Sequence, residues 1–162
     1  MVVVKWILIV LVLLPLALLA AGQAGLLTGH APSDLGVHDG RLKPPSSTPN
    51  SVSSQAGLYP DHPMRAYAAV APLPMRGQTT ATLAAVRSVV EAIPGGVVVT
   101  SEPGYLYAQF TTRWLKFVDD VEFWVDPAAN VVQVRSASRL GGKDFGVNRV
   151  RVEAIRTALA QR

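Results

Sequence analysis

The stretch FVDDVEFWVDPAANVVQVRSAS, residues 117–138, decides the fold of this chain. Apolar and polar side chains alternate along residues 121–126 and again along residues 131–138, which is the two-residue period of a strand with one buried face. The residues between them, 126–130, include Pro, Asp and Asn and predict a tight turn. Because a short turn joins strands that pair antiparallel, this stretch predicts a β-hairpin.

The charged residues of the hairpin indicate its register. When the two apolar faces are placed together, Arg135 lies directly opposite Glu122, or opposite Asp120 if the register slips by two residues. Opposite charges at facing positions of an antiparallel pair contribute roughly 0.2–1 kcal/mol. We therefore expect Arg135 to form a structural ion pair inside the fold.

The charges in and just after the hairpin divide by sign. The formal net charge is +4, a mild excess for 162 residues. Residues 119–126 carry four acids and no base, whereas residues 135–151 carry five bases and one acid. Two neighbouring blocks of opposite sign favour ion pairs within one fold, and no lysine-rich tail of the nucleic-acid-binding kind is present. We expect no nucleic-acid partner.

The remaining patterns complete the predicted fold. Strands are expected over residues 97–101 and 105–113, with a short edge strand over 67–70. Apolar residues at helical spacing predict helices over residues 80–93 and 145–160. The fold class is therefore α+β, an antiparallel sheet of about four to five strands packed against two amphipathic helices.

The N-terminus carries an apolar run that begins at Val2 and ends at Ala21, interrupted by Lys5 and Pro15. Its length is about the 20 residues that a bilayer core requires, so we interpret it as a membrane helix whose partner is the lipid bilayer. The alternative is a signal segment cleaved among the small residues 20–24, which leaves a secreted or periplasmic domain. Because Lys5 lies on the short N-terminal side, the positive-inside tendency places the rest of the chain on the extracytoplasmic side of the cell membrane.

The chain thus divides into three parts. Residues 1–22 form the membrane anchor or signal segment. Residues 23–65, rich in Gly, Pro, Ser and His and without a sustained period, form an extended arm. Residues 66–162 form a single α+β domain, since a chain of this length has room for one modest core.

Several kinds of chemistry are excluded by residue types. The chain has no cysteine, which rules out disulfides, cysteine-ligated metals and thiol catalysis. The spacing of His30, His38 and His62 matches no metal site. Nucleophile motifs, phosphate-binding glycine loops and the dinucleotide fingerprint are absent from the sequence. We expect no metal and no cofactor.

Three ordered motifs resemble one family. They are LGVHDGRLKPPSSTPNSVSSQ (35–55), FVDDVEFWVD (117–126) and VRSASRLGGKDFGVNRVRVEAI (134–155). Together they are similar to the domain of unknown function 1499 family over about residues 35–160. That family is largely bacterial with plastid relatives, often follows membrane helices or export signals, and has no established reaction.

The resemblance implies where the typical residues of that family lie in this chain. They correspond to Asp120, Glu122, Arg135, Ser136, Ser138, Arg139, Gly141, Asp144, Asn148, Arg149 and Arg151. The resemblance also implies two cysteines flanking the Pro-Asn motif, where Pro45 and Ser51 stand here. A disulfide that could hold the arm in relatives is therefore absent.

These residues divide into a structural and a candidate binding group. We expect Asp144 to cap the last helix, and we assign Asp120, Glu122, Arg135, Asp144 and Asn148 to a structural charge network. The candidate ligand-binding cations are Arg139, Lys143, Arg149 and Arg151.

The leading hypothesis is a membrane-anchored extracytoplasmic binding or interaction module. Its cations would recognise an anionic small molecule, a lipid head group or an envelope protein. The alternative is a hydrolase that uses Asp120 and Glu122, which lie on one strand face roughly 6.6 Å apart by strand rise. Arg135 would hold both carboxylates ionised, which disfavours a general acid, so we expect binding rather than catalysis.

Overall fold

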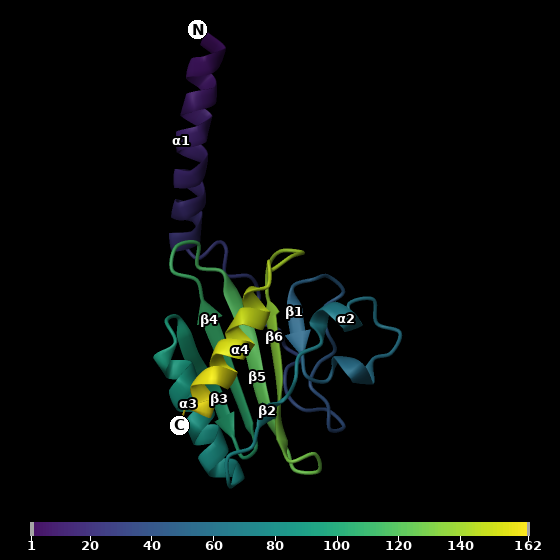
Figure 1. Ribbon diagram of the computed structural model, residues 1–162. Helices are drawn as coiled ribbons and strands as arrows, with labels where there is room; N and C mark the ends of the chain where they lie inside the picture. The colour runs from purple at the N-terminus through teal and green to yellow at the C-terminus, as the bar shows by residue number, and fades with distance from the viewer. Residues whose placement is uncertain (1, 162) are drawn as a thin grey trace.

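The computed structural model describes residues 2–161. Its helices and strands are arranged as one α+β fold behind a projecting N-terminal helix (Figure 1). In chain order they are α1 (Val2–Gln23), β1 (Ser51–Ser53), the 3-10 helix Ala56–Leu58, α2 (Arg65–Ala68), β2 (Leu73–Pro74), α3 (Thr79–Ala92), β3 (Gly96–Glu102), β4 (Tyr105–Thr111), β5 (Val118–Asp126), β6 (Val131–Ser138) and α4 (Val147–Ala160).

The six strands form one antiparallel sheet in the order β1-β6-β5-β4-β3, and β2 also pairs with β6. The hairpin of residues 117–138 is confirmed as β5 and β6. Glu122 lies opposite Arg135, which is the register expected from the apolar faces. The hairpin therefore sets which side chains of the two strands share a face.

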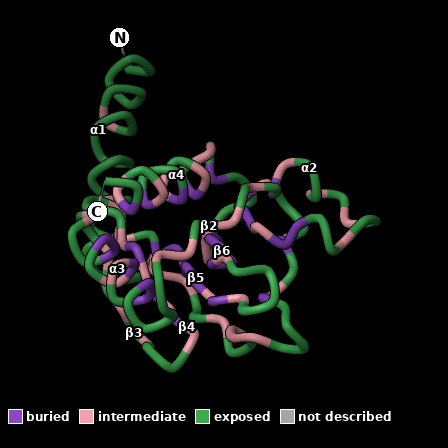
Figure 2. Tube along the Cα trace, turned by 60° about the horizontal axis from the view of Figure 1, so that its bottom comes forward, coloured by how far each residue is buried: buried purple, intermediate pink, exposed green. Residues whose placement is uncertain are grey.

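The hydrophobic core lies between one face of the sheet and the helices α3 and α4 (Figures 1 and 2). Val121 and Phe123 of the hairpin are fully buried there, together with Val86 of α3 and Ile155 of α4. Full burial of such a side chain contributes roughly 1.5–3 kcal/mol. This apolar layer positions the hairpin rigidly beneath both helices.

The prediction of an edge strand over residues 67–70 is wrong for most of its length, since within that range only Ala69 forms a β-bridge, an isolated parallel one with Ser53. Residues 65–68 form α2 instead, in which the Ala68 amide donates to the Met64 carbonyl over 2.8 Å. The second strand beside β6 is β2, a few residues further on. A run of four residues is too short to distinguish the two-residue period of a strand from one turn of helix.

The segment expected as an extended arm, residues 23–65, contributes to the fold directly. It contains β1, whose Ser53 pairs with Arg135 of β6, and its Leu42 and Ala56 are buried. The sheet therefore extends beyond residues 66–162. The part of the segment before β1, residues 30–47, which we call the arm, contacts the face of the sheet opposite the helices.

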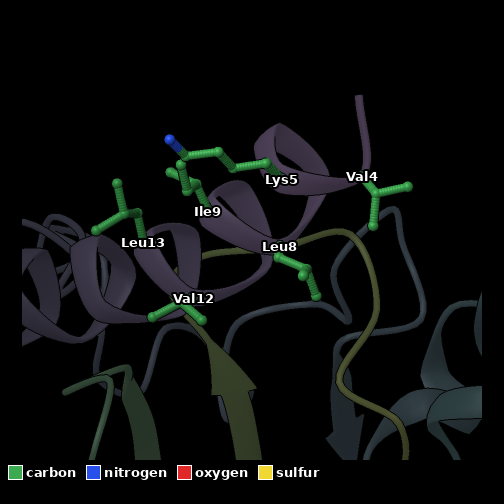
Figure 3. A pocket seen from close by; sticks show the side chains of 6 residues that line it. All are labelled: Val4, Lys5, Leu8, Ile9, Val12 and Leu13. Carbon is green, nitrogen blue, oxygen red and sulfur yellow. The ribbon is translucent and has the colours of Figure 1, made fainter. Parts of the chain in front are cut away.

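Helix α1 points away from the rest of the protein (Figure 1). Its 22 residues are long and apolar enough to span a membrane or to act as a signal, and its apolar window has no buried residue. At 1.5 Å per residue it is about 33 Å long, close to the thickness of a bilayer core. Figure 3 shows apolar side chains such as Leu8 and Val12 projecting from it, and both residues are more than half exposed.

Candidate functional site

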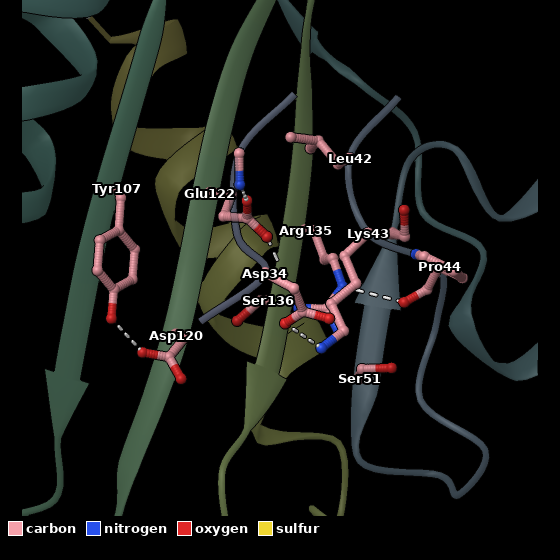
Figure 4. A network of polar contacts seen from close by, with 12 residues as sticks. Asp34, Leu42, Lys43, Pro44, Ser51, Tyr107, Asp120, Glu122, Arg135 and Ser136 are labelled. Carbon is pink, nitrogen blue, oxygen red and sulfur yellow. Dashed lines mark hydrogen bonds and ion pairs between the residues drawn. The ribbon is translucent and has the colours of Figure 1, made fainter. Parts of the chain in front are cut away.

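The face of the sheet opposite the helices is polar but buried. Asp120 and Glu122 on β5 are two residues apart and therefore share this face. Arg135 on β6 lies on it too, because it pairs directly with Glu122. All three are buried, and Figure 4 shows them on neighbouring strands with the arm residues Lys43 and Pro44 beside Arg135. Charged groups out of water need partners, so their contacts define what this face can do.

Asp120 is held by two side chains. Arg139 donates to both of its carboxylate oxygens, over 2.8 Å from Nε and 2.7 Å from Nη2. The Tyr107 hydroxyl donates to Oδ1 over 2.5 Å. Hydrogen bonding to Asp120 raises the pKa of Arg139, whose side chain is almost fully buried. Arg139 is thus paired with a carboxylate inside the fold and is not a free surface cation.

Glu122 is held less completely. Its Oε1 accepts from the Gly36 amide of the arm over 2.8 Å and from the Tyr105 hydroxyl over 2.9 Å. Its Oε2 has no hydrogen-bond partner among residues 2–161 and lies 3.7 Å from Nη1 of Arg135. Burial raises the pKa of Glu122 above its ordinary value despite the opposing effects of Gly36 and Arg135. The expectation that Arg135 holds both carboxylates ionised is therefore corrected: Arg139 pairs with Asp120, and burial outweighs Arg135 at Glu122.

The raised pKa of Glu122 makes stability depend on pH. The folded state binds the Glu122 proton more tightly than the unfolded state, so this group lowers stability as the pH rises from the unfolded pKa, near 4.5, to the folded pKa. Glu122→Gln keeps an oxygen for Gly36 and Tyr105 but cannot ionise. We expect the unfolding free energy of the variant to rise relative to wild type as the pH increases above about 4.5. Urea titrations at each pH measure this, and a pH-independent difference would contradict it.

Arg135 has unused hydrogen-bonding capacity. It is only 4% exposed, yet its one hydrogen bond to residues 2–161 runs from Nε to the Pro44 carbonyl, over 3.2 Å. A guanidinium has five N–H donors. The side chain lines a pocket of about 400 Å³ between the arm and the sheet. The charged residues that line this pocket are Lys43, Asp120, Arg135 and Arg139, and His30 lies there too.

The other three candidate cations lie elsewhere. Arg149 donates to the carbonyls of Tyr67 and Ala69 beside α2. Arg151 pairs with Asp119 on the helix-covered face of the sheet. Lys143 is exposed, with its Nζ 5.6 Å from the ring centre of Phe145. The structure does not bring Arg139, Lys143, Arg149 and Arg151 to one common space.

Asn148 is the centre of a second polar network, between α4 and the end of β6. It is fully buried, and its side chain has five hydrogen-bond partners. Its side-chain Nδ2 group donates to the Asn50 carbonyl, Ser138 Oγ and Asp144 Oδ2. Its side-chain Oδ1 accepts from Ser136 Oγ and Arg151 Nη1.

Asp144 caps α4, as expected from the sequence. Its carboxylate accepts from the Gly146 and Asn148 amides over 3.0 and 3.1 Å, and from the Tyr67 hydroxyl. Burial alone would raise the pKa of Asp144, but these hydrogen bonds outweigh burial and lower it.

Some residues of these networks were missed from the sequence. Asn50, next to Pro49, is buried and donates to the Gly141 carbonyl over 2.7 Å. The Pro-Asn pair within the first motif was the available signal. Tyr107 and Lys43 had no signal, because their patterns are those of ordinary strand and loop residues.

A hydrogen bond joins the arm to β1 near the positions where relatives are expected to have cysteines. Ser51 accepts from the Ser46 amide over 2.8 Å, next to Pro45. This contact helps to hold the arm over the pocket.

Comparison with known families places these networks in context. The model of the family DUF1499, described as a protein of unknown function, matches residues 41–159. The chain belongs to this family. In this DUF1499 protein the matched range contains the whole sheet and both polar networks, whereas α1 and Gly36 lie before it. No curated protein and no solved structure matches the chain.

Proposed function

We propose that this protein is a membrane-tethered module that binds a small anionic ligand in the pocket between the arm and the polar face of the sheet. The observation that carries the proposal is Arg135, a buried guanidinium with one hydrogen bond. Its two Nη groups form no hydrogen bond with residues 2–161 and are not fully buried, so they are open to a partner in the pocket. A carboxylate or phosphate that accepts from the two Nη groups of Arg135 is such a partner.

The charges that line the pocket favour the binding of an anionic ligand. Three cations, Lys43, Arg135 and Arg139, line it against one acid, Asp120. Glu122 neutralises part of this excess, since its Oε2 lies 3.7 Å from Nη1 of Arg135. Asp34 neutralises another part, since it accepts from Lys43 Nζ over 2.6 Å. Because Asp34 is largely exposed, this ion pair exchanges for a ligand contact at little cost. Of the four cations singled out from the sequence, only Arg139 belongs to this pocket.

The size of the pocket limits the ligand. About 400 Å³ lies at the lower end of small-molecule sites, which suits a phosphate or carboxylate group with a short attached chain. A soluble metabolite and a lipid head group share this chemistry. The position of Lys5 near the N-terminal end of the apolar run supports an extracytoplasmic domain, so we propose an anionic component of the envelope.

The same contacts favour binding over hydrolysis. Asp120 is engaged by Arg139 and Tyr107, and Glu122 is 0% exposed beneath the arm. A hydrolase that used these two carboxylates would have to displace the arm to admit substrate and water.

The test uses the full chain purified from its own membrane in three forms. Arg135→Lys keeps the charge facing Glu122 but loses the planar fork of donors. Arg87→Gln is the control, since it removes a cation from the exposed face of α3. We expect native mass spectrometry to show an anionic species on wild type and on Arg87→Gln, and at least tenfold less on Arg135→Lys. The mass of that species distinguishes a lipid from a soluble ligand.

Thermal unfolding with inorganic phosphate gives an independent measurement. Phosphate should raise the Tm of wild type and of Arg87→Gln, and should not raise that of Arg135→Lys. Equal shifts in all three proteins, or the absence of both a bound species and a shift in wild type, would overturn the proposal.

A further inference from the structure

Two neighbouring loops expose large apolar side chains at one end of the sheet. The loop between β4 and β5, residues 112–117, contains Trp114, which is 62% exposed. The loop between β6 and α4, residues 139–146, contains Phe145, which is 85% exposed. Phe117 and Leu140 are exposed on the same two loops. Exposed apolar side chains of this size at one end of the fold indicate a contact surface.

Each loop also carries a cation close to its aromatic ring. The guanidinium carbon of Arg113 lies 4.8 Å from the ring centre of Trp114, and Lys143 Nζ lies 5.6 Å from that of Phe145. Lys116 adds a third cation to the first loop. Aromatic rings beside Lys or Arg are the composition that favours the boundary between bilayer and water, where cations also meet anionic head groups.

Both loops lie at the end of the sheet from which α1 leaves (Figure 1). The Arg139 amide donates to the Val118 carbonyl over 3.1 Å, which joins the starts of β5 and of the second loop. Gln23 at the end of α1 donates through Nε2 to the Trp114 carbonyl over 2.7 Å.

Helix α1 packs tightly against the first loop. A Cβ atom at Gly22 would lie 2.6 Å from the Leu115 carbonyl oxygen, so the helix and the loop approach as closely as a glycine allows. The hydrogen-bond donor to the Trp114 carbonyl, Gln23, lies only two positions beyond Ala21, the end of the apolar run. At 1.5 Å per residue this is an axial separation of about 3 Å, which places the loop at the edge of the bilayer when α1 spans it.

The backbone of both loops contains a residue in the left-handed region. Lys116 has φ 56° and Phe145 has φ 54°. This conformation is unfavourable for residues other than glycine, and most so for bulky ones. Phe145 is nevertheless held in it beside Asp144, whose carboxylate accepts from the Gly146 amide over 3.0 Å. The network around Asp144 therefore keeps an aromatic ring in solvent at a conformational cost.

We propose that these two loops form a bilayer-contacting surface that seats the domain on the membrane beside α1. The apolar side chains of Trp114, Phe117, Leu140 and Phe145 enter the interfacial layer. Arg113, Lys116 and Lys143 face the head groups of anionic lipids. The occupant is the bilayer because the apolar helix leaves the domain at this surface and the cations match anionic lipids. The side chains that enter or face the bilayer in this proposal are not among those that line the ligand pocket, so either proposal can fail without the other.

The absence of cysteine makes a direct test possible. A single cysteine is introduced by Phe145→Cys in one full-length protein and by Ala128→Cys in another, and each is labelled with the fluorophore NBD. Ala128 is the control because it is exposed in the β5–β6 turn, at the opposite end of the sheet. Both proteins are reconstituted in vesicles of phosphatidylcholine with phosphatidylglycerol, with and without a head-group-labelled quencher lipid.

We expect the label at position 145 to show blue-shifted emission and at least twofold stronger quenching than the label at position 128. Equal quenching at the two positions would overturn the proposal. A blue shift at 145 without lipid quenching would also overturn it, because it indicates a protein partner on this surface.

The cations are tested in the labelled Phe145→Cys protein. Lys116→Glu together with Lys143→Glu should reduce quenching at position 145 in vesicles that contain phosphatidylglycerol. In pure phosphatidylcholine the same pair of substitutions should have a smaller effect. Equal effects in the two lipids would contradict the role assigned to the cations.

Discussion

Asn148→Ala is expected to lower the free energy of unfolding by about 3–5 kcal/mol, because each buried polar group left without a partner costs roughly 1–3 kcal/mol. The substitution removes five side-chain contacts, and Ser136 Oγ loses its acceptor in a buried position. The Asn50 carbonyl keeps only the Ser138 amide as a donor. The junction between β6, α4 and the segment before β1 thus loses its common partner.

Urea unfolding of the full chain in detergent, followed by far-ultraviolet circular dichroism, measures the change. Thr157→Ala is the matched control, since Thr157 lies on the exposed side of the same helix and its hydroxyl donates to the Glu153 carbonyl one turn earlier. We expect a change within about 0.5 kcal/mol for the control. A loss below about 1 kcal/mol for Asn148→Ala would show that the network does not stabilise the fold.

Arg151→Met is expected to cost about 3–5 kcal/mol, the range for removing one partner of a buried ion pair. Asp119, its partner on β5, is 4% exposed and would be left as an uncompensated charge beneath α4. The variant also loses the hydrogen bonds to Ser136 and Asn148, and the guanidinium contact with the Phe110 ring at 4.8 Å.

The double variant Asp119→Leu with Arg151→Met separates these effects. Because replacing both members of a buried pair with apolar residues is often nearly neutral, the double variant should recover most of the loss. Urea unfolding of wild type, both single variants and the double variant completes the cycle. Additive losses in the double variant would mean that the two side chains do not stabilise each other.

The sequence predicted the hairpin, its register and the cap at Asp144 because each depends on local order. Side-chain alternation is a property of the strand itself, and the turn at residues 126–130 limits how the two strands can align. The capping carboxylate acts within four residues of itself. Such features need no knowledge of the rest of the chain.

The separation of the candidate cations was not predictable in this way. Arg139 and Arg151 are 12 residues apart, yet they pair with Asp120 and Asp119, which are consecutive and point to opposite faces of β5. The sequence showed two blocks of opposite charge and correctly indicated that they pair. Which base meets which acid depends on where α4 crosses the sheet.

The sequence by itself determined the α+β class, the central hairpin and the apolar N-terminal helix, since all three follow from the period and length of apolar runs. Only the tertiary structure decided that the polar face of the sheet is buried. The contacts that bury it join Gly36 to Glu122 and Pro44 to Arg135, 86 and 91 residues apart. An alternating strand presents the same pattern whether its polar face meets water or another segment. The arm has no period of its own, so its place over Arg135 depends on contacts that form only when the whole chain is folded.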